Sequence, residues 1–379
     1  MDWPRRRIAR WLAIAAVALL GLTVAVWAVL PNGKLARVER RADCYEPARQ
    51  PPVETLADGR KAVRLSVLLW NVEGLPWPIR SGRDPKLARI ADWIAKRRAA
   101  GLGPDILILH KAFIPAASRI GGVADYRSIL PGPAVDRPRH MPIPIPPAGH
   151  AEGGRWWKGE GIGKWLDSGL YIATDLPFLE GTRERPLPAY ASDAFYADSC
   201  AGYDCLSNKG GMIVHLAVPG APAPLTIFNT HRNSREPSGV SIARAEAAHA
   251  MQTRENDALL HALGGDGAMI AAGDFNNYRA GDRIGRFAND PAFRLAAKGS
   301  GLRARAAPMT DAKAWIDAYD LLGFRSSDAL RIEPLAVATL FDGKNGPRLS
   351  DHDAQYIVFR LSWRGNALAL PVAVPRCAA

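Results

Sequence analysis

The stretch PDILILHKAF, residues 104–113, decides the fold class of this chain. Its apolar run predicts a short buried strand, because strands that are covered on both faces are apolar throughout. The run ends abruptly in His110 and Lys111, an imidazole ring followed by a positive charge. Side chains at such strand ends are often catalytic in sheet proteins, so this end is a candidate functional position.

Signals for strands and helices alternate on both sides of this stretch. Asp84 and Pro85 are suited to begin a helix over 84–101, and a longer helix is expected over 241–263. Short helices are expected after Asp290 and after Thr310. The expected strands are 63–70, 106–110, 169–173, 212–218, 225–229, 269–272, 331–337 and 354–361. This alternation favours an α/β fold with packed sheets.

Two segments do not follow this pattern. Residues 31–60 are polar and proline-rich and predict a linker. Residues 131–163 are rich in proline and glycine, which predicts a long surface loop near the functional site. Trp156, Trp157 and Trp165 in and beside this loop are expected to be packing groups rather than lipid contacts.

The N-terminal region holds much of the positive charge. Of 379 residues with a net charge of +12, the first 41 carry eight Lys/Arg and two acids. Residues 11–30 contain no charge and predict one transmembrane signal-anchor helix, with residues 1–10 as a basic cytoplasmic tail. The rest would lie on the periplasmic side of a bacterial inner membrane. A cleaved signal peptide ending near Ala28 is the alternative.

The four cysteines are consistent with export to an oxidising compartment. Cys200 and Cys205 are close enough in sequence for a local bridge, and Cys44 and Cys377 lie near the two ends of the globular part. We expect both bridges, although four cysteines allow three pairings. The spacings typical of zinc sites are absent.

Six stretches carry the functional signal, and each lies at an expected strand or strand end. They are LLWNVEGLP (68–76), PDILILHKAF (104–113), SGLYIAT (168–174), TIFNTHRNS (226–234), AAGDFNNY (271–278) and LSDHDAQYIVFRL (349–361). In this order, they resemble the endonuclease/exonuclease/phosphatase superfamily. The resemblance implies a four-layer α/β sandwich over 61–365, with two β-sheets packed face to face and flanked by helices, and a C-terminal tail over 366–379.

The same resemblance assigns roles in phosphodiester hydrolysis, which needs a base for water, groups that hold the phosphoryl oxygens and, in this superfamily, a divalent cation such as Mg²⁺. Asp274 matches the general base, and Asn276 matches a phosphate contact. His352 matches a phosphate contact or general acid. His231 matches the second catalytic histidine, and Glu333 matches the acid that supports His352. The positions near the metal are matched by Asn71, Glu73 and Asp351.

Lys111 departs from the family pattern, which places a metal-binding glutamate at this position. Four interpretations remain open. In the first, the chain is a pseudoenzyme that binds phosphorylated ligands. In the second, the Lys111 ammonium replaces the metal, and in the third, Glu73 and Asp351 hold a displaced ion. In the fourth, the motif is shifted in register.

The substrate class also comes from resemblance. SGLYIAT, CLSNKGGMIVHL and FNTHRNS are similar to the bacterial sphingomyelinase-like branch, which implies a phosphodiesterase acting on phospholipid headgroups, sphingomyelinase/phospholipase C-like. An exported nuclease is the alternative enzyme, but the mild basic excess beyond residue 41 argues little for nucleic acid. No protein partner is indicated.

Overall fold

The computed structural model describes residues 3–29, 37–137, 150, 152–179, 188–265, 267–277, 320–372 and 374–378. The helices expected after Asp290 and Thr310 lie outside these residues, as does part of the loop expected over 131–163.

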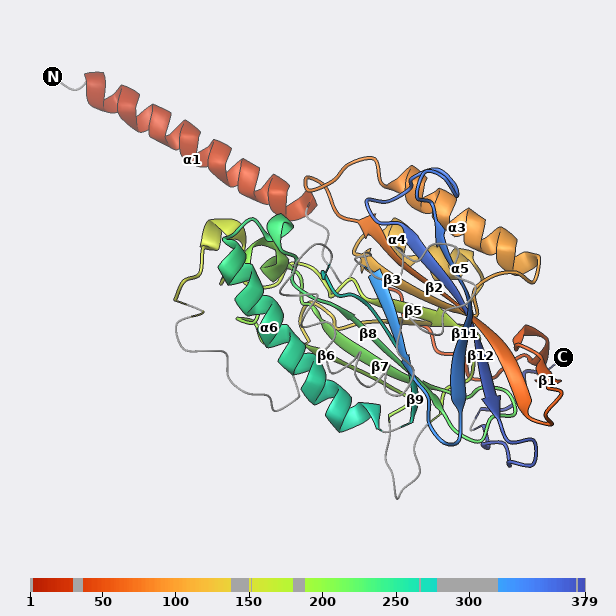
Figure 1. Ribbon diagram of the computed structural model, residues 1–379. Coiled ribbons are helices and arrows are strands. Elements are labelled where there is room, and N and C mark those ends of the chain that lie inside the picture. Colours follow the sequence, from red (N-terminus) through yellow and green to blue (C-terminus); the bar gives the residue numbers. More distant parts are fainter. Residues whose placement is uncertain are drawn as a thin grey trace.

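The described chain forms two mixed β-sheets (Figure 1). The larger has the order β11-β12-β2-β3-β5-β4, with β1 paired to β2, and the smaller has the order β10-β9-β8-β7-β6. The larger sheet contains β1 (Val53–Thr55), β2 (Lys61–Gly74), β3 (Ile106–Ala112), β4 (Ser128–Pro131), β5 (Tyr171–Thr174), β11 (Arg331–Leu340) and β12 (Ala354–Trp363). The smaller sheet contains β6 (Tyr190–Ala194), β7 (Gly210–Leu216), β8 (Leu225–His231), β9 (Ala268–Asp274) and β10 (Asp320–Arg325).

The central strand β2 is buried on both faces, and its side chains alternate between two cores. Val67 and Leu69 join the core that also contains Ile227 and Ile270 of the smaller sheet, so the two sheets pack face to face. Leu68 and its alternating neighbours point the other way, into the core beneath helix α3 (Asp84–Ala99).

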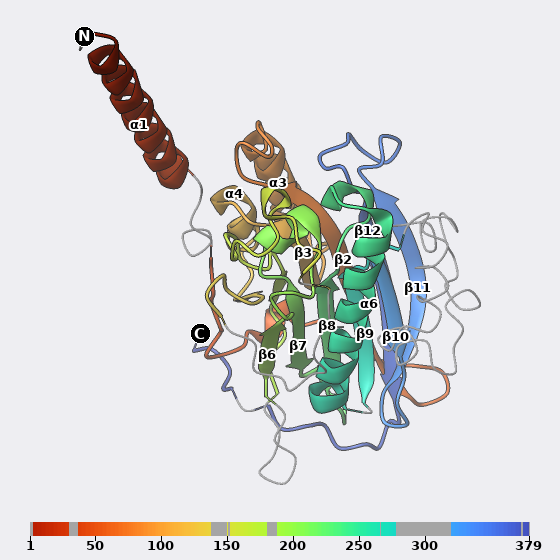
Figure 2. The ribbon, with the colours of Figure 1, turned by 90° about the vertical axis from the view of Figure 1, so that its left-hand side faces the viewer.

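Helices cover the outer face of each sheet. α3, α4 (Pro115–Ser118) and α5 (Ile120–Val123) lie on the larger sheet. On the smaller sheet lies α6 (Ile242–Leu259), which continues as the π-helical turn η5 (Leu260–Gly264). Figure 2 shows α6 in front of β8 and β9, running roughly along these strands. The order helix, sheet, sheet, helix confirms the expected four-layer sandwich.

The N-terminal helix α1 (Trp3–Val29) belongs to neither sheet, and its described side chains are exposed. Across the described residues, no helix combines the length and the apolar character that crossing a membrane requires. The membrane-spanning helix expected over 11–30 stays a prediction.

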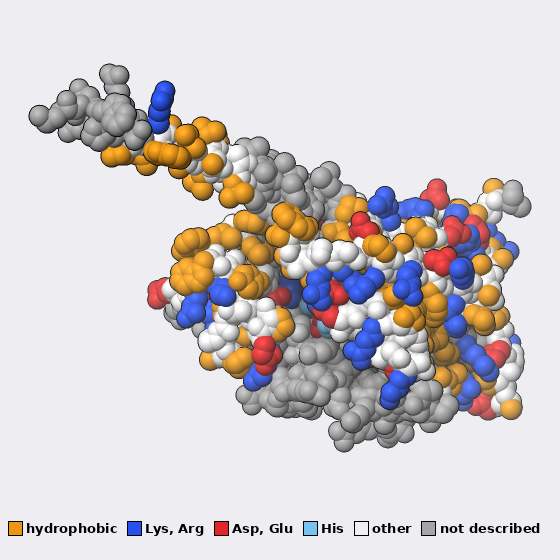
Figure 3. All heavy atoms as spheres, turned by 90° about the horizontal axis from the view of Figure 1, so that it is seen from above, with side chains coloured by type: hydrophobic (Ala, Val, Ile, Leu, Met, Phe, Trp, Pro, Cys, Tyr) orange, Lys and Arg blue, Asp and Glu red, His pale blue; other side chains and the backbone are white. Residues whose placement is uncertain are grey.

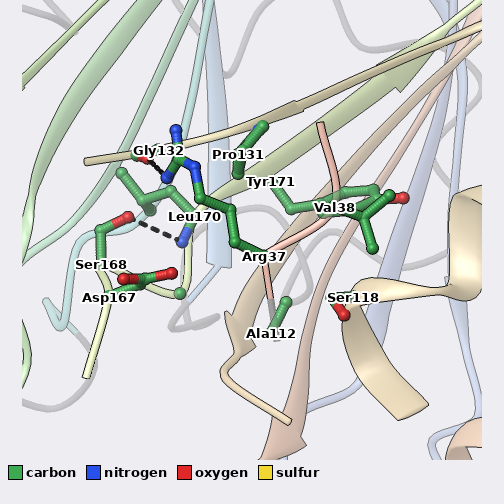
Figure 4. A pocket seen from close by; sticks show the side chains of 11 residues that line it. Arg37, Val38, Ala112, Ser118, Pro131, Gly132, Asp167, Ser168, Leu170 and Tyr171 are labelled. Carbon is green, nitrogen blue, oxygen red and sulfur yellow. Dashed lines mark hydrogen bonds between the residues drawn. The ribbon is translucent and has the colours of Figure 1, made fainter. Parts of the chain in front are cut away.

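The segment expected as a linker contains ordered structure in its described part. It holds the turn η1 (Pro47–Arg49) and strand β1, which pairs antiparallel with β2. Arg37 donates from Nη1 to the carbonyl oxygen of Gly132 at 2.7 Å, beside a cavity of about 20 Å³ (Figure 4). That cavity has room for about one water molecule and is too small for a substrate.

Both expected disulfides are confirmed. Cys200 is bonded to Cys205, and Cys44 is bonded to Cys377 across a separation of 333 residues. Arg127 donates from Nη2 to the sulfur atoms of the second bridge at 3.0 and 3.1 Å. This bridge therefore ties the segment before β1 to the chain after β12.

Removing the long bridge should destabilise the protein more than removing the short one. In the chain-entropy model, the long loop contributes about 6 kcal/mol and the short loop about 2 kcal/mol. We expect the Cys44→Ser, Cys377→Ser double variant to unfold at lower urea concentration than the Cys200→Ser, Cys205→Ser variant. The reverse order, or four alkylatable thiols in protein prepared without reductant, would contradict the assignment.

Candidate active site

Three predicted residues, Asn71, His231 and Asp274, converge because two pairs of parallel strands end at the same edge of the sandwich. β2 runs parallel to β3, with Asn71 opposite His110, and β8 runs parallel to β9, with His231 opposite Asp274. Parallel strands present their carboxyl ends at one edge of a sheet, and this is where a ligand-binding crevice forms. A cleft of about 740 Å³ lies there, and Figure 3 shows a face on which basic and acidic side chains surround a hollow.

Asp274 is the buried acid of this cleft. Its Oδ2 accepts a hydrogen bond from Asn71 Nδ2 at 2.8 Å and lies 3.3 Å from His231 Nε2, and its Oδ1 accepts from the Asn276 backbone at 3.2 Å. Burial raises the pKa of Asp274 above its ordinary value, although the positive charge of His352 opposes this effect. A carboxylate with a raised pKa is a stronger base than a solvated one.

His352 approaches the same oxygen of this carboxylate. Its Nε2 lies 3.9 Å from Asp274 Oδ2, and its Nδ1 is 2.7 Å from Asp320 Oδ2. Trp70 Nε1 donates to the His352 carbonyl oxygen at 2.9 Å, which fixes the loop before β12. Burial alone would lower the pKa of His352, but Asp320 and Asp274 outweigh it and raise this pKa above 6.5. The protonated ring is therefore more favoured than in a solvated histidine.

The acid that supports His352 is Asp320, and the expectation for Glu333 was wrong. Glu333 lies on β11 with a partly exposed side chain, 3.8 Å from Arg360 Nη1. Asp320 begins β10 and pairs in register with Asp274, so its buried carboxylate reaches His352 from the neighbouring strand. In the sequence, the acid immediately before the apolar stretch LLGF was the signal that could have identified it.

His110 was also missed as a site residue. It is fully buried and bridges the two sheets, with Nε2 at 2.7 Å from Asn229 Oδ1 and Nδ1 at 3.2 Å from Asp320 Oδ1. The Asp320 carboxylate therefore lies between two imidazoles. Burial would raise the pKa of Asp320, but His352 and His110 outweigh it and hold this pKa below its ordinary value.

Removing the His110 ring should weaken the fold, because two buried hydrogen bonds, one of them to a carboxylate, would be lost. We expect His110→Phe to lower the free energy of unfolding by about 2 kcal/mol in urea titration. The exposed His261 of η5 supplies the matched control, and His261→Phe should unfold like the wild type. Equal stability of both variants would contradict the bridging role.

His231 differs from His352 in its protonation state. Burial, followed by the charges of Lys209 and other neighbouring cations, lowers the pKa of His231 well below 6.5. The neutral ring lies with Nε2 toward Asp274, so we assign the proton to Nε2 and a hydrogen bond to the carboxylate.

Unusual backbone conformations concentrate at the cleft. Among the described residues, five that are not glycine have a positive φ, and Glu73, Lys111 and Asn276 are three of them, each with φ of 52°. Such conformations are costly for residues other than glycine and are typical of functional sites. The Asn276 side chain donates to the Arg232 carbonyl oxygen at 2.9 Å and lines the cleft.

Glu73 lines the cleft but is held by two arginines. Its carboxylate lies 2.5 Å from Arg80 Nε and 3.1 Å from Arg83 Nη1, and Glu73 is 3% exposed. A carboxylate with two guanidinium partners in this geometry is not available to a metal ion. The expectation that Glu73 lies next to a metal, or holds a displaced ion with Asp351, is therefore not supported.

Lys111 lies at the end of β3, as the sequence register predicted. The backbone of β2 approaches it closely: a Cβ on Gly74 would lie 2.6 Å from the Lys111 carbonyl oxygen, so only glycine fits there. The ammonium lines the cleft and lies 3.6 Å from Asp351 Oδ2. Asp351 is thus placed beside a fixed cation rather than beside carboxylates.

The residues present do not fit the divalent cation that the resemblance implies. Asp274, Asp320 and His352 offer donor atoms within 4.8 Å of one another, so their spacing alone could hold an ion. Yet Asp320 already contacts two imidazoles, and the raised pKa of His352 disfavours the neutral ring that a metal ion requires. A divalent ion ~4 Å from Lys111 would be repelled by about 8 kcal/mol at an effective dielectric of ~20.

Besides Lys111 and Arg80, the cleft is lined by two further cations, Lys209 and Arg235, and by an apolar side. Lys209 is buried, pairs with Asp204 and donates to the Arg232 carbonyl oxygen at 2.9 Å. The apolar lining is made by Leu75, Ile79, Phe113, Leu166, Leu206 and Pro237. Near it, Trp156, Trp157 and Trp165 are 69%, 58% and 42% exposed, so the expectation that they are packing groups was wrong.

Comparisons with known proteins find distant structural likeness. No family model matches the chain, and no curated protein matches it. Solved structures with a similar arrangement include sphingomyelinase C from Streptomyces griseocarneus, with TM-score 0.47 and 20% identity over 78% of this chain and 99% of that one. Another is a beta toxin mutant from Staphylococcus aureus with bound magnesium ions (0.49, 16%, 78% and 99%). A third is an endonuclease/exonuclease/phosphatase from Beutenbergia cavernae (0.47, 16%, 79% and 72%).

Proposed function

We propose that this chain is a phosphodiester hydrolase of the endonuclease/exonuclease/phosphatase superfamily. The observation that carries the proposal is the buried pairing of Asp274 with His352. The two side chains lie 3.9 Å apart in one cleft, the first with the environment of a base and the second with that of an acid. Two groups whose environments shift their pKa values in this way can act as the base and the acid of one reaction.

The reaction follows from these two groups. Asp274 accepts a proton from a water molecule, whose oxygen forms a new bond to phosphorus. The bond from phosphorus to the ester oxygen breaks, and His352 gives its proton to the leaving alkoxide. The products are a phosphomonoester and an alcohol, and the proton on Asp274 returns to solvent or to His352 in the next cycle.

The neighbouring polar groups orient the base. Asn71 donates to Asp274 Oδ2, and neutral His231 approaches the same oxygen. The other carboxylate oxygen, Oδ1, is oriented by the hydrogen bond that it accepts from the Asn276 backbone N–H. Asn276 lines the cleft beside this carboxylate and contacts the phosphoryl group in our proposal. We assign no Mg²⁺ to the site, because the donor atoms of Asp274, Asp320 and His352 already have partners within the protein.

Phospholipid headgroups are the substrate class we propose, in a sphingomyelinase/phospholipase C-like reaction. The apolar lining of the cleft and the exposed tryptophans beside it support this class, as does the sequence resemblance to the sphingomyelinase-like branch. An exported nuclease is the rival. Export itself is a proposal, supported by the two disulfides.

The substrate proposal is tested with the full chain, which is incubated with sphingomyelin vesicles, other phospholipid vesicles or DNA, in chelator and in Mg²⁺. We expect turnover of a phospholipid and release of a phosphorylated headgroup. Faster turnover of DNA would favour the nuclease. Binding of phosphorylated ligands without any turnover would favour the pseudoenzyme.

The pH dependence of kcat should be bell-shaped. Asp274 must be ionised, and since its pKa is raised, the acid limb should lie above 3.8. His352 must be protonated, and since its pKa is raised, activity should persist above pH 6.5 and fall at higher pH. Asp320→Asn removes the charge that raises the His352 pKa, so it should move the alkaline limb to lower pH. An alkaline limb that does not move would contradict the assignment of His352 as the acid.

A further inference from the structure

We propose that the Lys111 ammonium contacts the substrate phosphate directly and makes the hydrolysis independent of divalent metal ions. This inference rests on the proposed function, because it concerns how the same cleft neutralises the phosphodiester. It means that a side chain of this protein, rather than a metal ion, neutralises the negative charge of the phosphoryl oxygens.

The position of Lys111 is built by the fold. β3 is a central strand of the larger sheet, and its parallel pairing with β2 places Lys111 at the edge where His231, Asp274 and His352 meet. The positive φ of Lys111 turns its backbone out of the strand, beside a glycine that permits the close approach. The side chain is 20% exposed and lines the cleft, so the ammonium can contact a ligand there without a change of side-chain conformation.

The partner of Lys111 holds it only weakly. Among the described residues, Asp351 is the one acid with an oxygen within 4.0 Å of the ammonium, and the two atoms are 3.6 Å apart. That distance is too long for a hydrogen bond, and the Asp351 side chain is 40% exposed. A partly exposed pair of this kind contributes little, so a phosphate oxygen can replace the aspartate.

The other cations of the cleft are already committed to acids. Arg80 contacts Glu73, Lys209 contacts Asp204, and Arg235 contacts Glu236 and Glu246. Lys111 is therefore the cation best placed to bind a new anion. A phosphodiester carries one negative charge, and one ammonium neutralises it, with up to three N–H donors for the phosphoryl oxygens.

The role of Lys111 in the reaction is electrostatic. It donates hydrogen bonds to a non-bridging oxygen and keeps its protons throughout, while the proton transfers remain with Asp274 and His352. Donors aimed at charge that develops in a transition state typically contribute about 10²–10³ in kcat. The same contact binds the phosphate of the product, so inorganic phosphate is a suitable probe of the site.

The test uses the full chain after treatment with EDTA. Calorimetry measures the affinity for inorganic phosphate, and release of nitrophenolate from bis(para-nitrophenyl) phosphate measures turnover. We expect the wild type to bind phosphate and to turn over in EDTA, with no increase on addition of Mg²⁺, Mn²⁺ or Ca²⁺. Lys111→Met should lower kcat by about 100-fold and weaken phosphate binding at least about 10-fold, and Lys111→Arg should retain part of both.

The matched control is Lys96→Met, since Lys96 is an exposed lysine of α3 that pairs with Asp92 outside the cleft. It should behave like the wild type. Circular dichroism of Lys111→Met and the residual activity of Lys111→Arg separate loss of the contact from loss of the fold.

Two outcomes would overturn the inference. In the first, EDTA abolishes the activity, Mg²⁺ restores it, and Lys111→Met leaves this activity unchanged. That outcome would contradict the role of Lys111 but would still support the proposed hydrolysis. The other is phosphate affinity that Lys111→Met leaves unaltered. If phosphate binding depends on Lys111 but no phosphodiester is turned over with or without metal, the anion site is supported and the proposed hydrolysis fails.

Discussion

Asp274→Asn should lower kcat for phosphodiester hydrolysis by about 10³-fold, because an amide cannot accept the proton of the attacking water. The substitution keeps the shape of the side chain and the oxygen that accepts from Asn71. Since Asp274 is buried and its pKa is raised, ionisation of this carboxylate does not stabilise the fold. We therefore expect the free energy of unfolding to be retained or increased. Steady-state kinetics and urea titration check the two expectations.

An exposed aspartate on α6 supplies the control for this variant. Asp257→Asn makes the same chemical change away from the cleft and should leave kcat and stability unchanged. Loss of less than about tenfold in Asp274→Asn, with the control unaffected, would show that another group activates the water.

Asp320→Asn should have the second largest effect, through His352. Asp320 accepts from Nδ1 of both His110 and His352, whereas an asparagine has one accepting oxygen and presents an NH₂ group to the other ring. One imidazole would lose its partner, and the positive charge on His352 would lose its buried counter-charge. We expect kcat to fall about 100-fold or more for an ester with an alkoxide leaving group.

The leaving group distinguishes this effect from general damage. A nitrophenolate leaves without a proton, so Asp320→Asn should impair bis(para-nitrophenyl) phosphate turnover far less than turnover of an alkyl ester. Glu333→Gln is the matched control, because Glu333 pairs loosely with Arg360 and lies away from His352. Equal losses for both esters, or a large loss in Glu333→Gln, would contradict the assignment of Asp320 as the positioning residue.

The order of strand-end motifs was sufficient to predict the sandwich and most of its cleft. His231, Asp274 and His352 come together because the first two end strands, and the third precedes a strand, that could be predicted from the sequence. The short strands β1, β4, β6 and β10 were missed, since three to six residues carry too little periodic signal.

The missed site residues depend on pairings between strands that are distant in sequence. Asp320 enters the site because β10 pairs antiparallel with β9, and no local pattern around residue 320 encodes that register. Glu73 was misjudged for a related reason: its local position next to Asn71 is right, but Arg80 and Arg83 neutralise it from the following loop. Charge pairing in three dimensions, rather than residue type, decides which acids are free.

The most direct test of the central claim is the fate of oxygen during hydrolysis in water labelled with the heavy oxygen isotope. Mass spectrometry of the products locates the label after turnover of an alkyl phosphodiester by the full chain. Direct attack on phosphorus by water activated at Asp274 predicts one labelled oxygen on the phosphomonoester and none on the alcohol, with labelled product formed about 10³-fold more slowly by Asp274→Asn. Label in the alcohol, or labelled phosphomonoester formed equally fast by Asp274→Asn, would contradict the account.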